Sequence, residues 1–335
     1  MWRQTTAMSK HRRPDHVPTT RGDYVARPTR DWAKYNDELR DRPRKVTEFL
    51  VDCAVVASWR VKSGHRGQPA YSDGAIGACY MLRAVFHLSL RATEGVVRSI
   101  LEAAGLDAGL APDYSTLSKS RGRVRLRRGR GSSPISLIDG TGISLVTHGP
   151  WVQHKWRGGK LAEHRFVRVT LVTDAATGAV LACVVTQETG EGTGEVSQFE
   201  HLVSEAGRQG ATTIIGDGAY DTHDCYEHSR AHGVRLIAPP RVNAVYGLHP
   251  DRDVTLAQIG SHGMPEWKLR IEYHQRSRVE SDIGALKASF GDVTRARTFD
   301  GARADVLARA SVKNLCLLGA GALASLEEIR EPVAA

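Results

Sequence analysis

The spacing of apolar residues changes character near Gly131, which divides the chain into a helical part and a part rich in strands. Upstream, residues 46–59 and 75–106 carry apolar side chains at intervals of three and four, the period of an amphipathic helix. The residues Pro-Asp-Tyr-Ser at 112–115 offer capping groups for a short basic helix over 116–125. We therefore expect a helical region that spans residues 32–120.

Downstream of Gly131, alternating and continuous apolar runs predict strands with helices between them. Strands are expected at 135–146, 166–174, 179–186, 212–216 and 234–238, and helices at 196–209, 222–232 and 273–287. Residues 241–270 contain Pro, Gly and aromatic residues and are expected to form a short insertion. This order predicts an α/β (α+β) domain over residues 132–325, joined to the helical region by a linker at 121–131.

Residues Tyr273–Lys287 are predicted to form one helix, because no Pro interrupts them. A stripe about 60° wide on this helix holds four polar residues: Tyr273, Arg276, Glu280 and Lys287. An apolar stripe lies beside it: Val279, Ile283, Leu286 and Phe290. Such a helix can pack on a sheet and hold a polar row at its edge. The alternative is a plain surface helix with an Arg276–Glu280 pair worth a few tenths of a kcal/mol.

Two short apolar runs, Ile135–Gly142 and Thr212–Asp221, each look like a strand that ends in an aspartate, Asp139 or Asp217. Brought together with Glu280, these side chains would make an all-oxygen site suited to Mg²⁺ or Mn²⁺. The alternative stays open that Asp139-Gly140 and Asp217-Gly218 are turns. Asp221 is expected to cap the following helix.

These residues carry a resemblance to a known family. Tyr273, Arg276, Glu280 and Lys287 fit the Y-x2-R-x3-E-x6-K signature of the DDE transposases of bacterial insertion sequences, and the chain resembles the smaller members of that class. The likeness extends to the sequences around Asp139 and Asp217 and covers residues 32 to the C-terminus. Family members commonly have Ser after the first aspartate, where this chain has Gly140.

The resemblance implies a ribonuclease H-like catalytic core in which Asp139, Asp217 and Glu280 are catalytic and hold Mg²⁺, with Mn²⁺ as a substitute. It implies that water first nicks the DNA at the element's ends, and that the freed 3′-hydroxyl then attacks target DNA. Tyr273, Arg276 and Lys287 are expected to contact phosphates near the scissile bond. Two other classes remain open: a nuclease or resolvase of this fold without strand transfer, and a DNA-binding protein whose catalysis has lapsed.

Basic charge is concentrated at two places. Residues 1–45 hold twelve Lys or Arg against six Asp or Glu, and residues 121–130 hold six Arg and no acid; since the whole chain is +9, the remainder is slightly acidic. This distribution indicates a protein that grips a polyanion at defined sites. We expect all six linker arginines to contact DNA phosphates: Arg121, Arg123, Arg125, Arg127, Arg128 and Arg130.

The remaining expectations concern partners and location. Residues 1–31 are rich in Arg, Pro and Thr and are expected to be a basic arm that is disordered when alone. The basic helix over 116–125 would suit the last element of a helix-turn-helix, although the periodicity supports helices better than that motif. The resemblance implies double-stranded DNA as partner, including terminal inverted repeats and target, bound by a homodimer or larger assembly. With no apolar run long enough for a membrane span, a cytoplasmic, nucleoid-associated location is expected. The five scattered cysteines are given no role.

Overall fold

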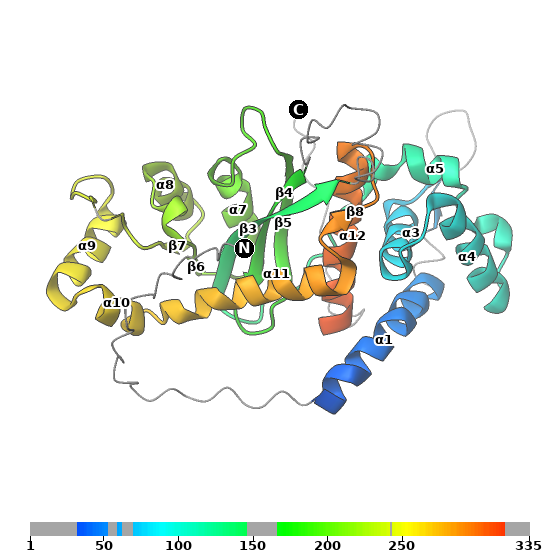
Figure 1. Cartoon of the computed structure of the whole chain (residues 1–335), viewed down its shortest axis with the longest axis horizontal. Coiled ribbons are helices and arrows are strands. Elements are labelled where there is room, and N and C mark those ends of the chain that lie inside the picture. The colour runs from blue at the N-terminus through cyan, green and yellow to red at the C-terminus, as the bar shows by residue number, and fades with distance from the viewer. Residues whose placement is uncertain (1–31, 53–58, 62–69, 146–165, 242, 319–335) are drawn as a thin grey trace, which may run out of the picture.

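The computed structural model describes residues 32–52, 59–61, 70–145, 166–241 and 243–318. The predicted basic arm of residues 1–31 and the last residues assigned to the second domain lie outside this part of the chain. Figure 1 shows a central sheet with the N-terminal helices at one end and two further helices, α9 (Pro250–His262) and α10 (Met264–Arg270), at the other. The chain is a mixed α/β structure, as the apolar pattern predicts. None of the helices described is long and apolar enough to cross a lipid bilayer.

The N-terminal part is helical, with helix ends fixed by capping side chains. Its elements are α1 (Trp32–Val51), β1 (Arg60–Val61), β2 (Ala70–Tyr71), α3 (Asp73–Phe86), α4 (Leu90–Ala103), η1 (Ala108–Leu110), α5 (Tyr114–Lys119) and η2 (Arg121–Arg123). Ser72 and Ser89 cap α3 and α4 by accepting backbone N–H groups. His87, at a left-handed φ of 51°, ends α3. The apolar run over 75–106 is therefore two helices.

The predicted basic helix over 116–125 is shorter in the structure. The Asp113 side chain accepts the N–H groups of Ser115 and Thr116 at 2.8 and 2.9 Å, so the predicted capping signal is confirmed. Helix α5 nevertheless ends at Lys119, and a single 3-10 turn follows it. Residues beyond that turn, including most of the linker arginines, lie in irregular chain rather than on a helix.

The second part is a mixed sheet. Its strands are β3 (Ile135–Leu145), β4 (Phe166–Asp174), β5 (Val180–Gln187), β6 (Thr213–Ile215), β7 (Arg235–Ile237) and β8 (Val293–Thr294). Strands β3 to β7 lie within a residue of the predicted positions, whereas the two-residue strand β8 was not predicted. Their order is β5-β4-β3-β6-β7, with β8 paired to the far end of β3. Strands β3, β4 and β5 are antiparallel neighbours, whereas β6 and β8 join β3, and β7 joins β6, in parallel.

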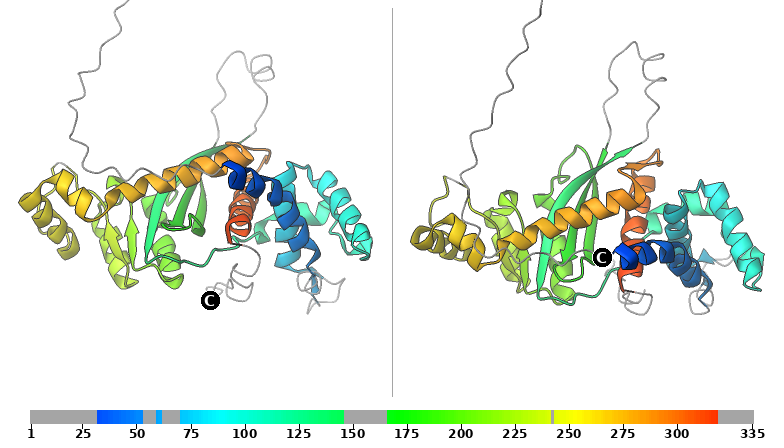
Figure 2. Two further views of the ribbon diagram at one scale, coloured as in Figure 1. Left: turned by 90° about the horizontal axis from the view of Figure 1, so that it is seen from below. Right: turned by 60° about the horizontal axis from the view of Figure 1, so that its bottom comes forward.

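Helices cover both faces of this sheet. One face packs against α11 (Ser277–Phe290) and α12 (Phe299–Leu318), and the other against α7 (Phe199–Arg208) and α8 (His223–Ala231). Neighbouring residues of a strand face opposite sides, and accordingly Leu137 lies in the first core and Ile138 in the second. Figure 2 shows α11, in orange, running along the sheet from α10 towards the N-terminal helices.

The N-terminal helices share the first of these cores. Leu50 of α1 and Ile76 of α3 belong to the same buried cluster as Leu137. Arg83 of α3 forms an ion pair with Asp305 of α12 at 3.0 Å, and both side chains are almost inaccessible to solvent. Helix α12 is thus the element that joins the helical region to the sheet.

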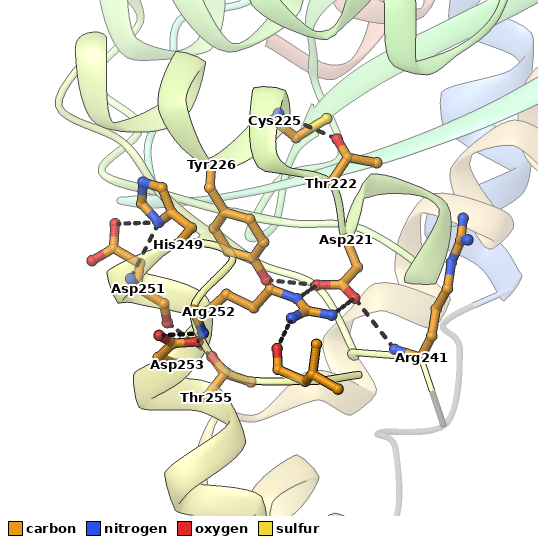
Figure 3. Close-up of polar contacts among 12 residues, drawn as sticks. Asp221, Thr222, Cys225, Tyr226, Arg241, His249, Asp251, Arg252, Asp253 and Thr255 are labelled. Carbon is orange, nitrogen blue, oxygen red and sulfur yellow. Dashed lines mark hydrogen bonds and ion pairs between the residues drawn. The ribbon is translucent and has the colours of Figure 1, made fainter. Parts of the chain in front are cut away.

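The region predicted as an insertion at 241–270 is largely helical and is held to the turn before α8 by a buried ion pair (Figure 3). Arg252 of α9 donates from Nε and NH2 to the two carboxylate oxygens of Asp221 at 2.7 and 3.1 Å. The Tyr226 hydroxyl donates to the same carboxylate at 3.2 Å. Asp221 was expected to cap α8, but the cap is the side chain of Thr222. Asp221 is instead the anchor for α9.

Replacing Arg252 with Ala is expected to lower the free energy of unfolding by about 3 kcal/mol. Removing one partner of a buried ion pair leaves the other charge uncompensated, which typically costs about 3–5 kcal/mol, and the Tyr226 hydroxyl still pairs with Asp221. Urea unfolding followed by circular dichroism measures the change. Arg230→Ala, on the exposed side of α8, is the control. A loss for Arg252→Ala no larger than that of the control would show that α9 is held by other contacts.

Candidate active site

Asp139 and Asp217 lie near each other because of the register of two parallel strands. Leu137 of β3 pairs with Ile215 of β6. Each aspartate lies two residues beyond its member of that pair. Two steps along an extended chain return a side chain to the same face. Both carboxylates therefore belong to the face of Leu137 and Ile215, which packs against α11.

Asp139 lies within β3 and not at a strand end, so that prediction is wrong, as is the alternative of a turn. Its backbone pairs with Leu171 of β4 across an uninterrupted ladder. On its other edge, β6 stops at Ile215 and β8 joins only at Ser144. Between these points no described strand covers the edge of β3. Asp217 lies just beyond the end of β6, as predicted, and its side chain also caps the 3-10 turn η4 (Gly218–Tyr220), so the turn alternative for Asp217-Gly218 holds as well.

The helix that carries Glu280 begins later than predicted. Glu272 has a left-handed φ of 52°, and the 3-10 turn η5 (Tyr273–Arg276) precedes α11. Tyr273 to Lys287 is therefore not one continuous α-helix. The apolar stripe is confirmed, since all four of its members are buried: Val279, Ile283, Leu286 and Phe290. Burial of that stripe sets the rotation of α11 and brings Glu280 to the edge where the two aspartates lie.

One side chain, Arg276, joins the three predicted carboxylates. Its NH1 group donates to Glu280 at 2.6 Å, and its NH2 group donates to Asp139 at 3.3 Å. The same NH2 lies 3.8 Å from a carboxylate oxygen of Asp217. The Asp139 side chain is 16% exposed, whereas those of Asp217 and Glu280 are 40% and 56% exposed. The cluster is open to solvent on the side of Glu280.

The pKa shifts of Asp139 and Arg276 reflect an excess of negative charge in this cluster. Burial raises the pKa of Asp139; Arg276 opposes the rise, while the charges of Asp217 and Glu280 add to it. Burial alone would lower the pKa of the Arg276 guanidinium, but the surrounding carboxylates outweigh it and raise that pKa. One guanidinium therefore neutralises only part of a cluster of three carboxylates.

The donor set fits a hard divalent cation, because every donor is a carboxylate oxygen and the cluster already holds a cationic group at its centre. Among the described residues, no three His, Cys, Asp or Glu side chains are yet arranged to enclose a metal ion. The three carboxylates form ion pairs with Arg276 instead. Mg²⁺ would thus compete with Arg276 for the same oxygens.

The other two signature residues differ in what they contact. The Tyr273 hydroxyl donates to the carbonyl oxygen of Gly216 at 3.2 Å, so it ties η5 to the residue before Asp217. Burial raises the pKa of Tyr273. Lys287 is half-buried on the Glu280 side of α11, two helical turns further along, and makes no hydrogen bond or ion pair with the residues described.

The structure contradicts part of the phosphate-binding prediction for the linker. Arg127 and Arg128 are only 8% and 9% exposed. The Arg127 guanidinium lies over the Phe49 ring at 4.9 Å, and burial lowers its pKa to about 10. Arg128 forms an ion pair with buried Glu205. Both arginine side chains are buried. The apolar residues Val124 and Leu126 are buried in the core, and the segment that carries them brings the two arginines inside with it.

The four other linker arginines retain some exposure. Arg125 and Arg130 are exposed, and Arg121 and Arg123 are half-buried. Arg123 is engaged with Asp73 and the backbone of Tyr71. Arg121 lines a groove between the N-terminal helices and the segment before α12. The predicted row of six phosphate contacts is therefore not a continuous surface.

Two features of the fold were missed from the sequence. Glu195 precedes α7, and its carboxylate lies against Gly140, where a β-carbon would overlap it. No motif marks this residue, which stands in a Gly-rich loop. The second feature is the groove that Arg121 lines, of about 600 Å³, which gathers basic residues from distant segments: Arg83, Arg91, Lys119, Arg121, Arg295 and Arg297. Only the folded chain brings them together.

Known proteins show similarity over most of this chain. A family model described as "Transposase DDE domain" matches residues 130–315, more than half of the chain, and a second model with that description matches residues 43–148. An uncharacterized protein of Aquifex aeolicus (strain VF5) is 26% identical over 280 residues, which cover 76% of this chain and 80% of the relative. The Drosophila P element transposase strand transfer complex matches at 10% identity and a TM-score of 0.26, covering 62% of this chain and 47% of that chain. The chain thus spans about half the length of that solved structure.

Proposed function

The chain belongs to the transposase DDE domain family, and from this premise we propose that it cuts DNA at the ends of its own insertion sequence and joins the freed 3′-hydroxyl groups to target DNA. The observation that carries the proposal is the meeting of Asp139, Asp217 and Glu280 around Arg276. Three carboxylates from two strands and a helix are a donor set for hydrolysis and transfer at phosphorus.

We also propose that residues 132–325 form a ribonuclease H-like catalytic domain, and residues 32–120 a DNA-binding region joined to it by residues 121–131. Three antiparallel strands followed by parallel strands, with helices on both faces, support the first assignment. The second is supported by the basic groove, to which this region contributes Arg83, Arg91 and Lys119. Because joining requires the two ends of an element to meet, at least two copies are proposed to act together on double-stranded DNA.

The chain's own groups have separate tasks in this proposal. Asp139, Asp217 and Glu280 would hold Mg²⁺, or Mn²⁺ in its place. Divalent cations held there would supply activation of the attacking oxygen and charge stabilisation of the leaving oxygen during in-line displacement at phosphorus. Once freed from the carboxylates, Arg276 contacts the phosphate beside the scissile bond, where its planar guanidinium suits bidentate binding.

Tyr273 and Lys287 flank that centre. Tyr273 positions Asp217 through the carbonyl of Gly216. Gly216 itself has little room, since a β-carbon there would come within 2.7 Å of the Tyr220 ring. Lys287 lies about 10 Å along α11 from Glu280. At that distance it reaches a phosphate further along the same strand.

The basic groove is the surface we propose for the DNA backbone. Among the residues that the structure describes, its lining includes six cations and no acidic side chain. Arg83 is neutralised by Asp305, whereas Arg91, Lys119 and Arg297 are exposed at its rim. The Arg91 guanidinium lies 4.6 Å from the centre of the Tyr114 ring, which holds the cation in place. Contacts of this kind bind phosphate without reading bases.

Replacing Arg91, Lys119 and Arg297 together with Gln is expected to flatten the salt dependence of DNA binding. Each lost phosphate contact lowers the slope of log affinity against log salt by about 0.9, so the slope should fall by about two to three units for end DNA and random DNA alike. Fluorescence anisotropy across a salt series measures it. A control triple variant at Arg230, Arg235 and Arg241, exposed near α8 and β7, should keep the slope. Equal slopes for both triple variants would place the DNA elsewhere.

The proposed activity is tested with the DNA that flanks this gene. Duplexes carrying its inverted repeats, incubated with the full chain and Mg²⁺, are expected to be nicked at the element ends and joined to a second duplex. Cutting without joining would make the protein a nuclease or resolvase. Binding without nicking in either Mg²⁺ or Mn²⁺ would make it a DNA-binding protein whose catalysis has lapsed. Either outcome overturns the proposal.

A further inference from the structure

Glu195 approaches the carboxylate cluster from the opposite face of the sheet. It lies in the loop between β5 and α7, directly before the turn η3 (Val196–Gln198). Its carboxylate lies so close to the Cα of Gly140 that a β-carbon at this position would overlap Oε1 and Oε2. Gly140 is the neighbour of Asp139 in β3 and faces the α7 side. The absence of a side chain at residue 140 is thus what admits Glu195 to the site.

Among the residues that the structure describes, none places a cationic group in direct contact with the carboxylate of Glu195. No hydrogen bond or ion pair with another described residue reaches it, although the loop around it is held by the contact from Thr186 to the carbonyl of Thr193 at 2.9 Å. Burial raises the pKa of Glu195; the charges of Asp139 and Asp217 add to the rise, and the charge of Arg168 opposes it. Glu195 is therefore a fourth carboxylate that interacts electrostatically with Asp139 and Asp217. Arg276 pairs with Asp139, Asp217 and Glu280.

A second observation concerns Tyr220, which packs in the same core as α7. Tyr220 is fully buried, and its hydroxyl has no hydrogen-bond partner among the described residues. Burial raises the pKa of this hydroxyl, and the charges that raise it further belong to Glu195, Asp217 and Asp139. A buried hydroxyl within the field of three carboxylates, and without an acceptor, indicates a place for a further polar group that the protein does not supply.

We propose that Glu195 is a fourth carboxylate of the catalytic site and holds a divalent cation together with Asp139 and Asp217, with Gly140 kept free of a side chain to let it in. This inference rests on the proposed function, because it assigns the same site a further ligand. It also gives the buried Tyr220 hydroxyl a partner, namely a water molecule or phosphate oxygen bound in the completed site.

Binding of Mn²⁺ to the full chain without DNA tests the proposal, with titration calorimetry as the readout. Glu195→Gln removes the charge and keeps the shape. Gly140→Ala pushes the flexible end of Glu195 away and leaves the carboxylate in the protein. Each is expected to weaken Mn²⁺ binding by about tenfold or more. The double variant should be no weaker than the single ones, because both act on one contact. Glu191→Gln, an exposed glutamate of the same loop, is the matched control and should change affinity less than twofold.

The nicking assay on flanking DNA separates this proposal from the one on which it rests. Glu195→Gln should slow nicking along with the loss of Mn²⁺ affinity, while DNA binding in a gel shift is unchanged. If Asp139→Asn and Asp217→Asn abolish nicking and a folded Glu195→Gln binds Mn²⁺ as the wild type does, Glu195 is not a ligand and the proposed function stands. If the two aspartate variants also nick normally, the proposed function itself fails. Should Glu195→Gln not fold, the Mn²⁺ affinity of Gly140→Ala decides.

Discussion

Glu280→Gln, Asp139→Asn and Asp217→Asn are each expected to abolish DNA nicking and joining in Mg²⁺, by about a thousandfold or more, while binding to end DNA persists. An amide keeps the size of the carboxylate but removes its charge, so a cation at the site loses an anionic ligand and the attacking oxygen loses its position. The three residues act as one unit, and the double variants should therefore be no slower than the single ones. Product gels and a gel shift on the same duplex measure both properties.

Asp292→Asn is the matched control for these variants. It removes an exposed carboxylate just beyond the end of α11, and its rates should stay within twofold of wild type. Asp282, on the same helix as Glu280, does not serve this purpose, because it forms an ion pair with Lys313 of α12 at 2.9 Å. Nicking by Glu280→Gln at a rate near that of the control would contradict the assignment of Glu280.

Much of the fold follows from local sequence, because each strand of the sheet is a short apolar run with its own boundary signals. The succession of strands β3 to β7 along the chain and the buried stripe of α11, with Val279 and Ile283, could be predicted for this reason. Asp217 could be placed at a strand end because β6 stops where Gly216 and Gly218 begin the turn. The helical period also placed Glu280 beside that buried stripe, although Arg276 lies in the preceding 3-10 turn rather than in α11.

The rest depends on contacts between distant segments. Asp139 lies within β3 because β3 continues to pair with β4 beyond it. The local sequence, an apolar run that ends at Asp-Gly, does not indicate this pairing. Arg127 and Arg128 resemble a solvent-exposed basic run, yet Phe49 and Glu205, which cover them, come from segments at least 77 residues away. Glu195 meets Gly140 across the sheet in the same way. The order of charged residues along the chain shows where charge is concentrated in the sequence. Which of these charges are exposed to solvent depends on the fold.

Arg276→Ala separates two roles that the structure gives to one side chain. Arg276 holds three carboxylates together in the absence of metal, so its loss should leave them mutually repelling and should lower the melting temperature of the metal-free protein. Removing this competing cation should also let Mn²⁺ bind more tightly, and Mn²⁺ should then raise the melting temperature of the variant by more than it raises that of wild type. A thermal shift series in Mn²⁺ measures the difference.

The second role appears in the rate of joining. Loss of a charged contact to the reacting phosphate should raise the barrier by about 2.7–4 kcal/mol, a slowing of about a hundredfold to a thousandfold, even at saturating Mn²⁺ where stability is restored. Arg276→Lys keeps the positive charge but loses the planar pair of donors, so its rate of joining should lie between those of Arg276→Ala and the wild type. Arg270→Ala, whose exposed guanidinium pairs with Glu266, should leave both measurements unchanged. If Arg276→Ala regains full joining activity once Mn²⁺ has restored its stability, Arg276 serves only to hold the three carboxylates together in the metal-free protein and does not touch the DNA.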